Sequence, residues 1–302
     1  MRKRETVRLS RPNVKALCAP ANERFPAVTG RYYKPLSLIL VLTLAATVGL
    51  VIDHRFPLPP STGESLNASD RTAAHASGVV IGTYNIRGMK GTGETPPFSR
   101  FVDILSTPPV HIAGLNEVRT PTVGGGNQAQ ALADTLGLSW LFASTAGRLL
   151  QQELGNAVLS RLPISRYDVI PLIYEGDLGG AMLRSRSHRN MIRLETEIGG
   201  QPTIIIVTHL DRGPLRLVQL DQVLAEFMRH PRAILMGDLN SPHADVLPRI
   251  EGRAQSAVCI GEPCEDQIDY ILTRGFKVTD RGSVPVGVSD HPYFWALLEP
   301  GF

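Results

Sequence analysis

The stretch Pro202–Asn240, "PTIIIVTHLDRGPLRLVQLDQVLAEFMRHPRAILMGDLN", contains a strand pattern, a helix pattern and a second strand pattern in one run. Its first part, "PTIIIVTHL", is mostly β-branched and predicts a buried strand. Residues 215–230 predict an amphipathic helix whose apolar side is formed by Leu217, Leu220, Leu224, Phe227 and Met228. "AILMGDLN" predicts the next strand, so this stretch indicates layered α/β structure.

The residues on either side of this stretch continue the pattern. Further strands are predicted at residues 79–86, 111–118, 154–160, 191–198, 267–273, 276–282 and 293–298, and helices at 98–106 and 129–138. Strands outnumber helices and several follow one another directly. The prediction is therefore an α+β domain at residues 78–302, with two packed β-sheets flanked by helices, rather than a pure βαβ series.

An apolar segment precedes this domain. Leu36 to Ile52 carries no charge over 17 residues, which at about 1.5 Å per residue is just long enough to cross a bilayer core. Nine basic residues precede it, which predicts a cytoplasmic N-terminus by the positive-inside rule. We expect a basic cytoplasmic segment at 1–34, a transmembrane signal anchor at 35–52, a Pro/Ser-rich linker at 53–77, and residues 78–302 on the extracytoplasmic side, periplasmic or extracellular. A cleaved signal peptide and a buried core helix are the alternatives.

The charge of the chain is unevenly distributed. The formal net charge is +3, but residues 78–302 contain 20 Lys and Arg against 23 Asp and Glu. This part of the chain lacks the broad positive field of a protein that grips nucleic acid through its backbone. The composition argues against tight non-specific DNA binding, but it does not exclude a nuclease.

Two of the three cysteines lie close together in the sequence. Cys259 and Cys264 bound the loop "CIGEPC", and in an oxidising compartment they predict a short-loop disulfide. Two free loop thiols are the alternative. Zinc is not favoured, because no pair of histidines lies near them.

Polar side chains gather where predicted strands end, which is where α/β folds build their sites. Asn156 instead opens a strand and Asp269 lies inside one. Taken singly, each of these residues is also explained as a turn, a cap or a solvated side chain. The set comprises Asn85, Glu117, Asn156, His209, Asp211, Asp238, Asn240, Asp269, Asp290 and His291.

Three members of this set suit a hard metal ion. Asn85 and Glu117 offer oxygen ligands, and Asp290 is a possible further ligand. No cluster of Cys and His has zinc spacing. The predicted cofactor is therefore Mg²⁺ or Mn²⁺.

Five other members suit attack on a phosphorus centre. His291 titrates near neutrality and is a candidate general base, with Asp269 fixing its tautomer. Asp238 is predicted to orient the attacking water. Asn240 and His209 are predicted to donate hydrogen bonds to the phosphate oxygens. Together with a metal ion, these residue types predict hydrolysis of a phosphoester.

Seven stretches carry these residues in a fixed order along the chain. They are "TYNIRG", "LNEV", "GNAVLSRLPI", "THLD", "GDLNS", "IDYIL" and "SDHPY". Together they resemble the endonuclease/exonuclease/phosphatase superfamily, whose members include pancreatic-type deoxyribonucleases, apurinic endonucleases, neutral sphingomyelinases and inositol polyphosphate 5-phosphatases. The resemblance covers nearly all of residues 78–302.

The resemblance implies a four-layered α/β sandwich of two mixed β-sheets and a divalent-metal phosphohydrolase. By analogy, Glu117 is the main metal ligand and Asn85 assists it, Asp238 positions or activates the water, and the histidine of "SDHPY" is an acid, a base or a phosphate contact. Asn156 and Asp211 fall in matching stretches and are predicted to bind substrate. One departure is Asn116, where the family commonly has Gln, and we expect it to tune activity rather than abolish it.

The substrate is less well defined by the sequence. Arg184, Arg186 and Arg189 lie in "GGAMLRSRSHRNMIRL" and are predicted to grip a second phosphate or a nucleic-acid backbone, with a solvated hairpin as the alternative. The favoured function is an anchored phosphodiesterase or phosphatase acting on lipid head groups or small phosphoesters. An anchored nuclease acting on DNA or RNA and a non-catalytic binding protein are the alternatives. No obligate protein partner is predicted.

Overall fold

The computed structural model describes residues 38–45, 60–63, 78–120, 126–146, 153–173, 188–258 and 265–301, and the chain divides into two units, residues 1–45 and 46–302. In the first unit, residues 38–45 form a helix with exposed side chains. Among the residues that the structure describes, no helix has both the length and the apolar character needed to cross a bilayer. Most of the predicted anchor at 35–52 lies outside those residues, so the anchor remains a prediction.

Two mixed β-sheets form the centre of the second unit. The seven-stranded sheet has the order β1 (Ser61–Gly63), β4 (Ser139–Ala146), β5 (Leu154–Ser160), β3 (Ile112–Arg119), β2 (Val79–Asn85), β13 (Tyr293–Pro300) and β12 (Phe276–Val284). The six-stranded sheet has the order β10 (Gln255–Ser256), β11 (Asp269–Arg274), β9 (Ala233–Asp238), β8 (Gln201–His209), β7 (Asn190–Ile198) and β6 (Arg166–Pro171). β2–β3 and β8–β9 are parallel pairs, and the other neighbours are antiparallel.

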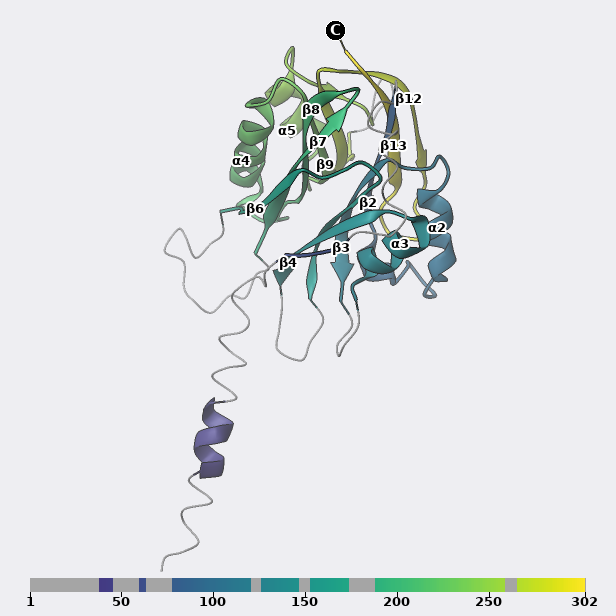
Figure 1. The fold of residues 1–302 in the computed structure, drawn as a ribbon. Coiled ribbons are helices and arrows are strands. Elements are labelled where there is room, and N and C mark those ends of the chain that lie inside the picture. Colours follow the sequence, from purple (N-terminus) through teal and green to yellow (C-terminus); the bar gives the residue numbers. More distant parts are fainter. Residues whose placement is uncertain are drawn as a thin grey trace, which may run out of the picture. The chain divides into compact units, whose positions relative to one another are not determined.

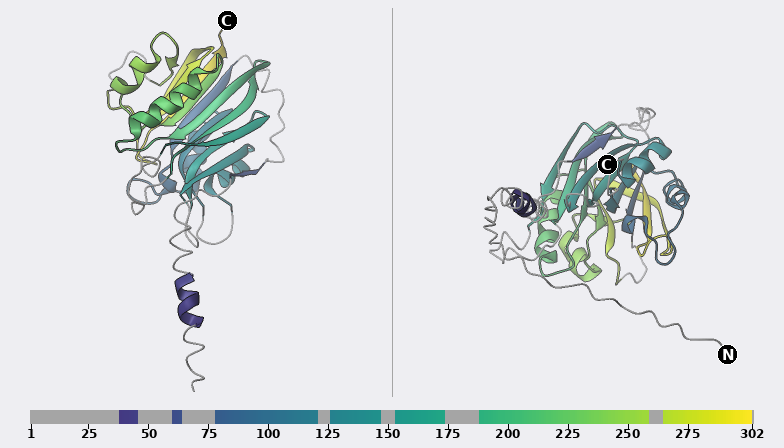
Figure 2. Two further views of the ribbon diagram at one scale, coloured as in Figure 1. Left: turned by 90° about the vertical axis from the view of Figure 1, so that its left-hand side faces the viewer. Right: turned by 90° about the horizontal axis from the view of Figure 1, so that it is seen from below.

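Helices cover the outer faces of both sheets. α2 (Phe98–Leu105) and α3 (Gln128–Leu136) lie on one side of the second unit, and α4 (Arg216–Met228) and α5 (His243–Ile250) lie on the other (Figures 1 and 2). Helix residues Phe101 and Leu132 share a core with the seven-stranded sheet, whereas Leu220 and Val246 share one with the six-stranded sheet. The prediction of two packed mixed sheets flanked by helices is confirmed.

The alternation of side chains along the central strands explains this layering. In β9, Ile234 and Met236 face the core between the two sheets, whereas Ala233 and Leu235 face the helix-covered core. All four are fully buried. A strand that is buried on both faces carries a continuous apolar run, which is the pattern that "AILM" shows.

The structure corrects several details of the sequence-based prediction. β1, β4, β6 and β10 and helix α5 were not predicted, and β1 lies within the predicted flexible linker, where Thr62 pairs with Leu141 of β4. α5 is short and contains Pro248, so it carries little helical periodicity. In α4, Leu217 is exposed and Val223 takes a place in the core instead.

Two strand–helix–strand units place the polar strand ends. β2, α2 and β3 form one unit, and β8, α4 and β9 form the other, and within each unit the two strands run parallel. Parallel strands end at the same edge of a sheet, so residues at their carboxyl ends are brought together. The two sheets pack face to face, and these edges carry the candidate site.

Candidate active site

Four strand ends contribute the central side chains of the site. Asn85 is the last residue of β2, His209 the last of β8 and Asp238 the last of β9. Glu117 lies near the end of β3, where the pairing with β5 shifts register and its own φ is +56°. Bulges of this kind re-aim side chains beside active sites, which accounts for the local strain at Glu117.

Asn85 connects a carboxylate from each sheet. Its Nδ2 lies 3.3 Å from Glu117 Oε1 and 3.1 Å from Asp238 Oδ2. Its Oδ1 accepts a hydrogen bond from the Arg87 backbone N–H at 3.0 Å, and its carbonyl accepts one from Ser289 Oγ at 2.6 Å. In this structure, Asn85 therefore spaces the two carboxylates through its amide nitrogen, and its side-chain oxygen faces the backbone of the following loop.

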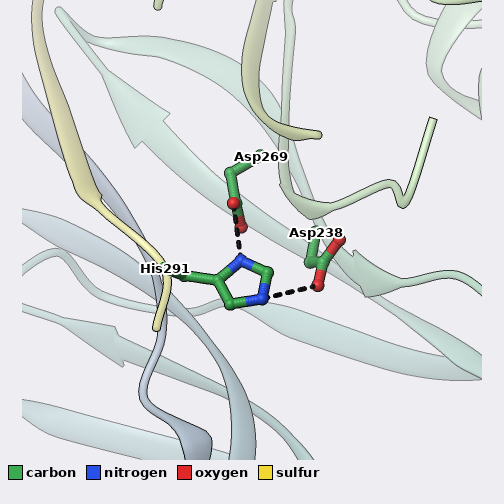
Figure 3. A group of neighbouring side chains, drawn as sticks. All are labelled: Asp238, Asp269 and His291. Atoms are coloured by element: carbon green, nitrogen blue, oxygen red, sulfur yellow. Dashed lines mark hydrogen bonds and ion pairs between the residues drawn. The ribbon is translucent and has the colours of Figure 1, made fainter. Parts of the chain in front are cut away.

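His291 is held between two aspartates, as Figure 3 shows. Its Nδ1 lies 2.7 Å from Asp269 Oδ2, and its Nε2 lies 3.7 Å from Asp238 Oδ2. Burial by itself lowers the pKa of His291, but the hydrogen bond and charge of Asp269, together with Asp238, outweigh it and raise that pKa to about 9. The ring is therefore protonated at neutral pH and acts as a donor. Burial and the charge of Asp269 raise the pKa of Asp238 above its ordinary value.

The raised pKa of His291 predicts a pH-dependent contribution to stability in the metal-free protein. The pKa is about 6.5 in the unfolded chain and about 9 in the folded one, so the stabilisation is complete below about pH 6.5 and is lost as pH rises through about 9. Asp269→Asn removes the charged partner. We expect the difference in unfolding free energy between wild type and Asp269→Asn, measured with urea in EDTA, to be larger near pH 6 than near pH 9.5. An equal difference at both pH values contradicts this expectation.

His209 differs electrostatically from His291. Burial, followed by the charges of Arg189, His291 and Arg212, lowers the pKa of His209 well below its ordinary value, so its ring is neutral at pH 7. Its Nε2 lies 3.3 Å from Asp238 Oδ2 without forming a hydrogen bond. A neutral imidazole donates one hydrogen bond, which fits the predicted contact with a phosphate oxygen.

Asn240 is fixed from several sides. Its φ is +46°, and its backbone N–H donates to Asp238 Oδ1 at 2.9 Å. Its Nδ2 donates to the Leu210 carbonyl at 2.9 Å, while Arg212 Nε donates to its Oδ1 at 3.3 Å. Arg216 Nη1 donates to its carbonyl at 3.0 Å. A donor held in this way needs little reorganisation to bind an oxyanion.

Three predicted residues have structural contacts that their expected roles did not include. Asp290, a predicted metal ligand, forms an ion pair with Arg87 at 3.3 Å. Asp211 Oδ1 accepts the backbone N–H groups of the two following residues, at 2.7 and 3.2 Å. Asn156 is buried, and both ends of its amide are bonded to other asparagines.

The predicted arginine cluster is only partly described. Arg184 and Arg186 lie outside the described residues. Arg189 precedes β7, and the charges of Asp211, Asp238 and Glu117 act on it. Burial lowers the pKa of Arg189 and these acids raise it, so its guanidinium lies in the field of the site. Cys259 and Cys264 also lie outside the described residues, and their disulfide remains a prediction.

Three ligand atoms of Asp238, Asp269 and His291 lie within 4.8 Å of one another. This group is already joined by the hydrogen bond between His291 and Asp269, which suits proton transfer. The carboxylates of Glu117 and Asp238 are oxygen donors of the kind that Mg²⁺ and Mn²⁺ prefer. Among the described residues, Asn85 is the only one that donates a hydrogen bond to the Glu117 carboxylate. These residues fit a hard divalent cation.

Several contributing residues were not predicted as part of the site. Asn190 is buried and contacts Asn156, and Ser289 is buried beneath Asn85. Arg212 and Arg216 hold Asn240. The only sequence signal was position, since Asn190 follows Arg189 and Ser289 begins "SDHPY". Their contacts join distant segments, which no local pattern indicates.

Comparisons with known proteins agree with this geometry. Residues 82–291 match the sequence model of a family described as "Endonuclease/Exonuclease/phosphatase family". No curated protein sequence matched the chain. Many solved structures are similar, all of those compared below at under 25% identity, so they show the fold alone.

Three of these structures illustrate the likeness. An endonuclease/exonuclease/phosphatase from Beutenbergia cavernae DSM 12333 has a TM-score of 0.59 and 21% identity, covering 75% of this chain and 72% of that one. A family protein from Leptotrichia buccalis C-1013-b has a TM-score of 0.58 and 15% identity, covering 73% and 99%. D. rerio TDP2 complexed with single strand DNA product has a TM-score of 0.57 and 14% identity, covering 74% and 100%.

Proposed function

This chain belongs to the endonuclease/exonuclease/phosphatase family, and from that premise we propose that it is a divalent-metal-dependent hydrolase of phosphoester bonds. The observation that carries the proposal is the pairing of Glu117 and Asp238, one carboxylate from each sheet, through Asn85. Cationic His291 and the neutral donor His209 lie against Asp238. A phosphate is an anion, and this arrangement surrounds it with donors beside a proton acceptor.

Each side chain has a part in the proposed reaction. Glu117 would hold Mg²⁺ or Mn²⁺, which would neutralise charge on the phosphate when bound. Asp238 accepts a proton from the attacking water. His209 and Asn240 donate hydrogen bonds to the phosphate oxygens. His291, kept protonated by its aspartate partner, donates to the phosphate or the leaving oxygen.

Metal removal gives a direct prediction. We expect EDTA to reduce hydrolysis to background, and Mg²⁺ or Mn²⁺ to restore it. Glu117→Gln keeps the size of the side chain but removes its charge. We therefore expect this variant to bind the activating Mg²⁺ or Mn²⁺ ion about tenfold or more weakly than wild type. The metal affinity is measured in two ways: by titrating activity with the metal ion, and by following bound Mn²⁺ with electron paramagnetic resonance. Glu153→Gln is the control, because the hydrogen bonds of Glu153 join its backbone to Thr120 and not to a residue of the site. Equal metal affinity in wild type and Glu117→Gln overturns the assignment.

The substrate class is tested by a panel. We propose lipid head groups or small phosphoesters, hydrolysed as phosphodiesters or phosphomonoesters, with Arg189 contacting the substrate. The slight negative charge of residues 78–302 supports this over nucleic acid. Purified full-length protein with Mg²⁺, Mn²⁺ or EDTA is incubated with bis-p-nitrophenyl phosphate, p-nitrophenyl phosphate, sphingomyelin, inositol phosphates, DNA and RNA. If no substrate is hydrolysed in an EDTA-sensitive way, the proposal of an enzyme fails and a binding protein remains.

A nuclease is the second candidate. The similarity to the structure of D. rerio TDP2 complexed with single strand DNA product favours including single-stranded DNA in the panel. Arg193, however, is bonded to Asp168, Glu195 and Glu226, so it offers little free charge to a nucleic-acid backbone. Selective cutting of DNA or RNA would favour the nuclease.

We also propose that the N-terminal segment anchors the protein in a membrane, with the catalytic domain on the extracytoplasmic side. The support is the uncharged run Leu36–Ile52 and the basic residues before it. No obligate protein partner is part of the proposal. Protease added to cells stripped of any wall and outer membrane should remove the domain if it lies outside the cytoplasmic membrane, whereas full protection of the domain contradicts this location.

A further inference from the structure

We propose that Asn116 is a positioning residue that fixes the backbone of Asp238 by bridging the two sheets. Asn116 belongs to β3 of the seven-stranded sheet, and Asp238 ends β9 of the six-stranded sheet. Both are fully buried. This inference deepens the proposed phosphoester hydrolysis and rests on it, because it concerns where the proton-accepting carboxylate is held.

The contact occurs at the end of β9, beside a residue with an unusual backbone conformation. Gly237 has a φ of +137°, and the N–H of the next residue, Asp238, donates across the gap between the sheets to Asn116 Oδ1 at 2.9 Å. The register partner of Gly237 is Thr208, whose carbonyl accepts a hydrogen bond from Asn116 Nδ2 at 3.0 Å. One side-chain amide therefore bonds to the backbone of both β8 and β9. A buried backbone group without such a partner would destabilise the end of the strand.

The hydrogen bonds determine which way the amide points. A backbone N–H can only donate, so the atom facing Asp238 N must be the oxygen of Asn116, and its nitrogen must face Thr208. The same nitrogen donates to Asn156 Oδ1 at 2.9 Å. Asn156 in turn donates to Asn190 Oδ1 at 3.0 Å, and Asn190 donates to the Ser144 carbonyl at 3.0 Å. This directional chain of buried amides holds Asn116 in one orientation.

Gly114, two residues before Asn116 in β3, explains why an asparagine fits at position 116. Gly114 and Asn116 lie on the same face of β3, because side chains alternate along a strand. A Cβ atom on Gly114 would lie 2.7 Å from Met236 Cγ and 3.0 Å from a Val207 methyl carbon. The bare glycine lets the sheets approach closely at this point. A short side chain then spans the gap, and a longer one would overpack it.

The position of the Asp238 backbone matters because the carboxylate acts at a short distance. Its Oδ1 accepts the Asn240 N–H, and its Oδ2 faces Asn85 and His291. Misplacing a catalytic group by about 1 Å can lower the rate by about a hundredfold. Asn116 is buried and does not touch substrate, so we expect its loss to lower kcat rather than raise KM.

The test compares two variants of the full-length protein with a matched control. Asn116→Leu is nearly isosteric and uncharged but loses all three hydrogen bonds. Asn116→Ala leaves room for water and serves if the leucine variant does not fold. Ile205→Val is the control, because Ile205 is buried in the same core between the sheets. The measurements are kcat and KM on bis-p-nitrophenyl phosphate with Mg²⁺, thermal melting, and hydrogen exchange at the Asp238 amide.

We expect the Asn116 variants to lower kcat by about tenfold to a hundredfold, with KM changed by less than about threefold, and to speed exchange at the Asp238 amide. The control should be slightly less stable, with unchanged kcat. A kcat within about twofold of wild type in a folded Asn116 variant, or unchanged exchange at the Asp238 amide, overturns the inference. If wild type hydrolyses no phosphoester, the proposed function fails, whereas the exchange measurement still decides whether Asn116 holds Asp238.

Discussion

Asp238→Asn is expected to lower kcat/KM for phosphoester hydrolysis by about a thousandfold, within the range that general acid–base groups contribute. The asparagine has almost the same shape, but it cannot accept a proton from water at neutral pH. Asp238 is fully buried at the end of β9, where its carboxylate faces Asn85, His209 and His291. Burial and the charge of Asp269 raise its pKa above the ordinary value, which makes it the stronger base and the main proton acceptor of the proposed reaction.

The measurement is kcat/KM with saturating Mg²⁺, with circular dichroism to verify the fold. Asp221→Asn is the matched control, because Asp221 is exposed and pairs with Arg249 away from the site. We expect the control to keep wild-type kcat/KM, since exposed ion pairs contribute little. If Asp238→Asn retains more than about a tenth of the activity, Asp238 is not the general base.

Gly237→Ala is expected to prevent stable folding, although the substitution adds a single methyl group. The φ of Gly237 is +137°, which L side chains rarely adopt, and its Cβ would lie 1.9 Å from the Thr208 carbonyl oxygen. That oxygen belongs to the backbone of the neighbouring strand β8, so it cannot rotate away. We expect a loss of at least about 4 kcal/mol in unfolding free energy, measured with urea.

A second glycine separates backbone strain from collision. Gly252 also has a positive φ, +67°, but a Cβ there would meet no atom within 4 Å. Gly252→Ala should therefore cost only about 1–2 kcal/mol, the penalty of the left-handed conformation alone. If the two variants are destabilised equally, the contact with Thr208 does not explain the need for glycine at position 237.

The predictable part of the fold follows from local patterns. The β-branched run "TIIIV" and the apolar "AILM" predicted β8 and β9, because strands buried on both faces need continuous apolar sequence. The missed elements lack such patterns. α5 is short and interrupted by Pro248, and β10 has only two residues. Leu217 was misplaced because periodicity defines a face of a helix but not the width of the contact that buries it.

The sequence predicted which residues belong to the candidate site better than it predicted the contacts that they make. The structure brings Asn85, Glu117, His209, Asp238 and His291 together at the strand ends. It pairs Asp290 with Arg87, and it buries Asn156 among other amides. Asp290 and Asn156 both fall in the sequence stretches that contribute to the site. Only the surrounding chain shows which way their side chains are directed.

The sequence by itself determined the family, the two-sheet architecture and the set of chemically competent residues, because motif order and hydrophobic alternation are properties of the chain alone. The tertiary structure decided how those residues act on one another. The protonation of His291 comes from the hydrogen bond and charge of Asp269, a residue 22 positions away, which outweigh the burial of the ring. The bridge from Asn116 to Asp238 spans 122 positions and two sheets. Electric fields and hydrogen bonds depend on distance in space, and the sequence gives no measure of that distance until the chain has folded.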